Sequence, residues 1–75
     1  MKDYVVIIKN KELHRLIRVI HCKDCLSELD ALIDAKQMLI NEGKIEEDII
    51  DIIFDDPAEV FFQVKIFALD NNSNI

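Results

Sequence analysis

One stretch of the chain, residues 24–43, has the pattern of a long amphipathic helix. Asp24 precedes it as a candidate N-cap, and Gly43, the only glycine of the chain, follows where a left-handed C-cap is needed. Glu28 and Asp30 place negative charge near the positive end of the helix dipole. The helical period brings apolar side chains onto one stripe, which we expect to be buried. The stripe consists of Cys25, Leu29, Leu32, Ile33, Leu39 and Ile40.

Three other apolar segments have the composition or alternation of strands. Residues 4–9 and 13–22 are rich in β-branched side chains, and the polar turn at 10–12 between them predicts an antiparallel hairpin. Residues 60–69 place successive side chains on alternating faces, as a strand does. These segments need another layer to pack against, and the helix supplies it.

The segment at residues 49–54 supports two interpretations. It is short and rich in isoleucine, which favours a strand ended by Pro57. The spacing of Ile45, Ile49 and Ile53 also fits a second amphipathic helix, so that alternative stays open. We expect the strand.

The resulting order of strand, strand, helix, strand, strand predicts an α+β fold. In its simplest packing, this ββαββ chain forms a four-stranded antiparallel sheet with one helix across one face. At 75 residues there is room for one small core. We expect a single domain over residues 1–70 and a disordered polar tail over residues 71–75.

The predicted sheet carries large apolar side chains on both faces, although one helix covers only one face. At about 25 cal/mol per Å² of apolar area, two or three such side chains left in water forgo several kcal/mol, which is comparable to the stability of a small domain. We therefore expect a second copy or another protein to cover the second face or a strand edge, with a homodimer as the leading case. The alternative is that the tail or a curled sheet covers it. The residues assigned to this face are Val5, Ile7, Ile17, Val19, Phe61, Phe67 and Leu69.

Charge is unevenly distributed along the chain, whose formal net charge is −6. Residues 1–23 carry six basic side chains and two acidic ones, whereas residues 24–75 carry three basic and thirteen acidic ones. An acidic cluster after the helix predicts a surface for a basic partner, such as a nucleic-acid-binding protein. The simpler interpretation is a solvated acidic surface. The cluster consists of Glu46, Glu47, Asp48, Asp51, Asp55, Asp56 and Glu59.

A CxxC motif, formed by Cys22 and Cys25, lies between a predicted strand and the predicted start of the helix. In this position it resembles the redox pair of thioredoxin-like proteins, in which a helix N-terminus stabilises the thiolate. The resemblance covers only these few residues. It implies dithiol redox chemistry or metal handling as an alternative function, whereas the simpler interpretation is a pair of small apolar core residues.

His21 and the two cysteines supply at most three ligands from one chain, while a structural zinc site needs four. His14 lies seven residues before His21, too far along an extended strand to complete such a site. We therefore expect no metal and no cofactor, and a metal shared across a dimer is the alternative.

Lys36 falls within the apolar stripe of the helix. Either its stem lies on the core while its ammonium reaches water, or it pairs with an acid across the core.

Basic residues of the hairpin form a second candidate patch, which would suit phosphate groups. The patch lacks stacking aromatic side chains and any recognition motif, so we expect no direct contact with nucleic acid. It consists of Lys9, Lys11, Arg15 and Arg18.

The sequence contains no catalytic triad, phosphate-binding loop or HExxH motif. We therefore expect a small, acidic, non-enzymatic protein-binding module. This size and charge are typical of inhibitors and accessory factors that phages and mobile elements encode. We therefore expect the protein in the cytoplasm, which includes the cytoplasm of an infected host cell. No apolar run is long enough to span a membrane, and no signal peptide is expected.

Overall fold

The computed structural model describes residues 1–56 and 58–69, and three strands in these ranges form one antiparallel sheet. The strands are β1 (Lys2–Asn10), β2 (Arg15–Cys25) and β3 (Phe62–Leu69). Their order is β2-β1-β3, so β1 is paired on both sides and the other two strands lie at the edges.

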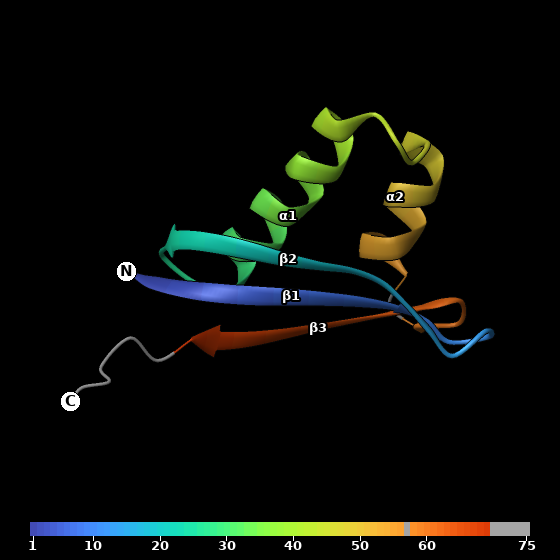
Figure 1. Cartoon of the computed structure of the whole chain (residues 1–75), viewed down its shortest axis with the longest axis horizontal. Coiled ribbons are helices and arrows are strands. Elements are labelled where there is room, and N and C mark those ends of the chain that lie inside the picture. The colour runs from blue at the N-terminus through green and yellow to red at the C-terminus, as the bar shows by residue number, and fades with distance from the viewer. Residues whose placement is uncertain (57, 70–75) are drawn as a thin grey trace.

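Two helices, α1 (Glu28–Glu42) and α2 (Glu47–Asp55), both lie on one face of this sheet (Figure 1). The predicted α+β class and the antiparallel sheet are confirmed. The predicted count of four strands and one helix is wrong for the described residues, because the expected third strand is a helix. The expected tail at residues 71–75 lies outside the described residues.

Helix α2 replaces the strand expected over residues 49–54. Glu47 and Asp48 lie in its first turn, where the helix dipole favours negative charge. Ile50 and Ile53 are both buried, and a separation of three residues places them on the same face of a helix. The amphipathic spacing therefore outweighed the strand preference of the isoleucines.

Helix α1 begins later than expected because β2 continues through the cysteine motif. Asp24 is not the N-cap: it lies in β2 with a φ of 55°, and its backbone N–H donates to the Asp3 carboxylate at 3.0 Å. Ser27 caps the helix, accepting the backbone N–H of Asp30 at 3.2 Å. Gly43 ends α1 in the left-handed conformation (φ 69°), as predicted.

The core lies between the inner face of β1 and β2 and the helices. Tyr4, Val6 and Ile8 alternate along β1, and the last two are fully buried. From α1, Ala31 and Ala35 contribute to this core, and both are fully buried. Small side chains at this seam let the helix approach the sheet closely.

The buried stripe of α1 is therefore rotated from the predicted one. Leu39 belongs to both, but Leu29 and Ile33 are 67% and 59% exposed. Cys25, assigned to the same stripe, instead ends β2 and is buried there. The prediction favoured the largest apolar side chains, whereas close packing against the sheet selects the alanines.

Leu39→Ala should lower the free energy of unfolding by about 2–5 kcal/mol, because it removes a buried leucine and leaves a cavity. Leu29→Ala is the matched control and should change it by no more than about 0.5 kcal/mol, because that side chain is mostly in water. Urea unfolding followed by circular dichroism measures both. A larger loss for Leu29→Ala than for Leu39→Ala would contradict this orientation of α1.

Candidate functional site

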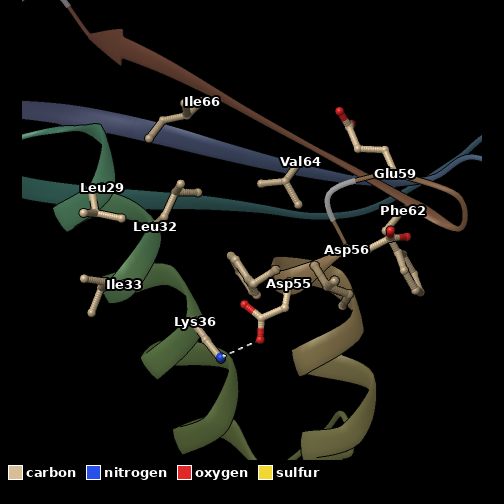
Figure 2. A pocket seen from close by; sticks show the side chains of 12 residues that line it. Leu29, Leu32, Ile33, Lys36, Asp55, Asp56, Glu59, Phe62, Val64 and Ile66 are labelled. Atoms are coloured by element: carbon tan, nitrogen blue, oxygen red, sulfur yellow. Dashed lines mark hydrogen bonds and ion pairs between the residues drawn. The ribbon is translucent and has the colours of Figure 1, made fainter.

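A groove of about 420 Å³ lies between α1, α2 and β3 on the helix side of the sheet (Figure 2). It forms because α1 packs mainly on β2 and β1, while α2 is short and contacts β3 and α1. The inner side chains of β3 are consequently only partly buried: Phe62, Val64 and Ile66. The volume lies within the range of known ligand pockets.

The groove is mostly apolar. Leu29, Leu32 and Ile33 of α1 face Val64 and Ile66 of β3 across it (Figure 2). The exposed side chains of Leu29 and Ile33 are therefore part of a concave apolar surface. A molecule bound to a concave surface removes more apolar area from water than one bound to a flat surface. The sequence signal for this surface was an apolar stripe on α1 wider than contact with the sheet requires.

One end of the groove is charged. Lys36 of α1 pairs with two carboxylates of α2, at 3.2 Å from Asp51 and 3.5 Å from Asp55. These two acids are four residues apart and so lie on the same side of α2. Hydrogen bonding to Asp51 first, and then the charge of Asp55, raise the pKa of Lys36. The lysine thus pairs with exposed acids of the neighbouring helix and not with an acid across the core, since the side chains of Asp51 and Asp55 are 61% and 68% exposed.

Four of the seven predicted acidic residues lie at this end of the molecule. Asp55, Asp56 and Glu59 line the groove, and Asp51 is held beside it by Lys36. The Asp56 carboxylate also accepts the backbone N–H of Val60 at 2.9 Å, so it helps to hold the turn before β3. The hydrogen bonds that hold this turn are thus made by the carboxylate of Asp56, whereas that of Asp55 pairs with Lys36.

The other three predicted acids are not at the groove. Glu46, Glu47 and Asp48 are exposed at the N-terminus of α2, whereas the groove lies beside its C-terminal turn. Their position near the positive end of the helix dipole gives them a structural role in α2. The cluster that looks continuous in the sequence is thus divided by the helix.

The opposite face of the sheet carries part of the predicted apolar second face. Val19 lies across from Ile7 in the β1–β2 register, and Phe67 lies across from Val5 in the β1–β3 register. Val19 and Phe67 are 44% and 50% exposed. Both helices lie on the other face (Figure 1), so no described helix covers these side chains.

The remaining residues assigned to that face lie at its margins. Ile17 falls where the β1–β2 register shifts, and Leu69 is the last residue of β3. Phe61 precedes β3 and lines a second, shallower hollow beside α2, together with Ile52 and Val60.

Charge separates by layer. The helix-bearing segment, residues 28–59, has eleven acidic side chains and two basic ones, whereas residues 1–27 and 60–69 have seven basic and three acidic ones. The alternation of the strands places Lys9 and Lys65 on the open face of the sheet. The groove therefore lies in an acidic layer, and the open face lies in a basic one.

The cysteines are buried at the end of β2 and not at a helix N-terminus. Cys22 and Cys25 are 2% and 1% exposed, and both are free thiols. The Cys22 thiol lies 3.4 Å from the Ala31 carbonyl oxygen, and the Cys25 thiol lies 3.8 Å from the Asp34 carboxylate. Burial first, and then the charge of Asp34, raise the pKa of both thiols. This environment favours the neutral thiol, opposite to what a thioredoxin-like pair requires.

The histidine near the motif lies apart from the cysteines. His21 and Cys22 are consecutive in β2, so they point to opposite faces of the sheet. In residues 1–56 and 58–69, no group of three or more His, Cys, Asp or Glu side chains is placed to hold a metal ion.

The basic hairpin patch is divided between the two faces. Arg18 forms a bidentate ion pair with Glu42 at the C-terminus of α1, with Nη2 2.7 Å from Oε2. The hydrogen bond from Arg18 lowers the pKa of Glu42. Lys11 lies in the turn after β1, and Arg15 pairs with Asn10 at the exposed end of the hairpin.

No helix in the described part of the chain is long and apolar enough to cross a membrane. No protein-family model matches the chain, and comparisons with curated proteins and with solved structures found no match.

We expect both cysteines to react slowly with a thiol reagent such as DTNB in the native protein at neutral pH. Burial blocks access, and the raised pKa values keep both groups as neutral thiols. The same assay in denaturant should report two rapidly reacting thiols per chain, which serves as the control. Fast reaction of either cysteine in the folded state would contradict this and revive the dithiol function.

Proposed function

We propose that the protein is a non-enzymatic protein-binding module whose groove holds a basic, amphipathic segment of a partner protein. The observation that carries the proposal is the combination of apolar walls and an acidic end within one groove. A nucleic-acid-binding protein is one class of partner with such a segment. Occupying its basic surface would make the present protein an inhibitor or accessory factor.

The two parts of the groove would have different tasks. Contact with the exposed side chains of Leu29 and Ile33 would supply most of the affinity, because it removes apolar surface from water. Asp55 and Glu59 would orient the basic side chains of the partner and speed its association. Binding should therefore weaken as ionic strength rises.

Lys36 sets the net charge at the acidic end of the groove. Its ion pairs hold α1 and α2 together beside the groove and partly neutralise Asp51 and Asp55. The same pairs raise the pKa of the amine further above neutral pH, so the cation stays at this end of the groove.

A synthetic helical peptide with leucines on one face and lysines on the other is a suitable probe. We expect it to shift the NMR amide signals of Leu29, Ile33 and Ile66, and to bind more weakly at high salt. A peptide of the same composition in scrambled order should bind at least about tenfold more weakly, because it cannot present one apolar face.

Charge variants locate the electrostatic contact. Asp55→Asn with Glu59→Gln should weaken peptide binding about five- to tenfold, since two charges at the groove are lost. Glu47→Gln with Asp48→Asn removes the same charge from the far end of α2 and should weaken binding less than about twofold. Equal losses in the two pairs, or amide shifts confined to the open sheet face, would refute the proposed site.

Lys36→Met tests the same electrostatic contact by making the groove more negative instead of less negative. Methionine keeps an apolar stem but removes the cation, so Asp51 and Asp55 become available to the peptide. We expect binding to tighten about two- to threefold, with stability changed by no more than about 1 kcal/mol. Weaker binding of this variant, with its stability retained, would contradict the role assigned to the acids.

A further inference from the structure

The outer edge of β3 has no strand beside it in the described part of the chain (Figure 1). β3 has eight residues and pairs with β1 in a continuous register without a shift. Lys65 is its only charged side chain, and it contains no proline. A regular, weakly charged edge of this kind is a template for pairing with another strand.

The other edge of the sheet is protected. The β1–β2 register shifts near both ends of β2, and Asp24 bends the strand with a φ of 55°. β2 also carries Arg15, Arg18 and Lys23 along its length. Register shifts and charges are devices that discourage edge-to-edge pairing. Register shifts occur only in the β1–β2 pair, and the β2 edge carries more charged side chains than β3 does.

The pairing of β3 with β1 determines which backbone N–H and C=O groups of β3 point toward the open edge. The Lys11 N–H donates to the Phe61 carbonyl oxygen at 2.9 Å, which extends the ladder by one pair. Hydrogen-bonded and non-hydrogen-bonded pairs alternate in an antiparallel ladder. The N–H and C=O groups of Val64, Ile66 and Ala68 therefore point away from β1, toward the open edge.

We propose that two copies of the chain pair through β3 as antiparallel strands, forming a six-stranded sheet in the order β2-β1-β3-β3-β1-β2. The two-fold axis passes through the pair formed by Ile66 and its copy. This register aligns the outward-pointing backbone groups, with Val64 opposite Ala68 of the second copy.

Side chains favour this register over the one with the axis at Lys65. With the axis at Ile66, Lys65 lies opposite Phe67 of the second copy on the open face, at a pair where side chains approach closely. A lysine over an aromatic ring is a favourable pair, and it occurs twice. With the axis at Lys65, two lysines would lie opposite each other, which is unfavourable.

The dimer has a consequence for the groove. A two-fold axis perpendicular to the sheet places both helix layers on the same face, and Val64 and Ile66 are groove residues. The two grooves therefore lie side by side. Because the two β3 strands are antiparallel, the acidic α2 helices lie toward opposite ends of the dimer and do not repel each other strongly.

Hydrogen exchange of the unmodified protein tests the pairing directly. Light scattering across a range of concentrations should give the mass of a dimer, and the amides of Val64, Ile66 and Ala68 should be protected from exchange. A monomer at every concentration would overturn the proposal. A dimer in which these three amides exchange as rapidly as those of exposed turns would overturn it as well.

Variants separate this interface from the open sheet face. Ala68→Pro removes an outward N–H, which an edge strand tolerates, and should raise the dimer dissociation constant at least about tenfold. Ala68→Val is the matched control and should leave the dimer intact, as should Val19→Lys on the open face. A dimer lost with Val19→Lys but kept with Ala68→Pro would overturn the proposal. If Ala68→Pro does not fold, the exchange measurement decides.

The test of the β3 dimer is independent of the test of peptide binding in the groove. A monomeric Ala68→Pro variant should still bind the amphipathic peptide, because its groove side chains are unchanged. Peptide binding without a dimer would reject only the pairing of β3, and a dimer without peptide binding would reject only the use of the groove.

Discussion

The fold depends on the burial of strand β1. It is the only strand of the described sheet paired on both sides, and its inward side chains Val6 and Ile8 are completely buried beneath the helices. In a chain this short, one central strand must contribute to most of the core. Ala31 and Ala35 complete this arrangement, because their small side chains let α1 settle directly over the sheet.

The position of α1 leaves the inner face of β3 incompletely covered. Since α1 lies mainly over β2 and β1, and α2 has only nine residues, the two helices leave the inner face of β3 partly open. The groove and the accessible edge of β3 therefore have one structural origin. A longer second helix or a fourth strand would have removed one or both surfaces.

Charge reinforces the difference between the two sides of the molecule. The helix layer is strongly acidic and the strands are basic, so the protein presents surfaces of opposite character to potential partners. Two ion-pair systems connect the elements: Arg18 joins β2 to Glu42 of α1, and Lys36 joins α1 to α2. The second system lies at the groove, where it balances the acids that would otherwise repel one another.

The α+β class, the hairpin, the existence of α1 and its end at Gly43 could all be predicted from the sequence, because these features depend on local period and turn chemistry. The sequence also located the acidic segment. Three features became clear only from the packing of the whole chain: residues 49–54 are helical, Ala31 and Ala35 rather than Leu29 face the sheet, and four of the acids gather near the groove. Local patterns define an apolar stripe, but packing against a particular sheet decides which part of that stripe is buried.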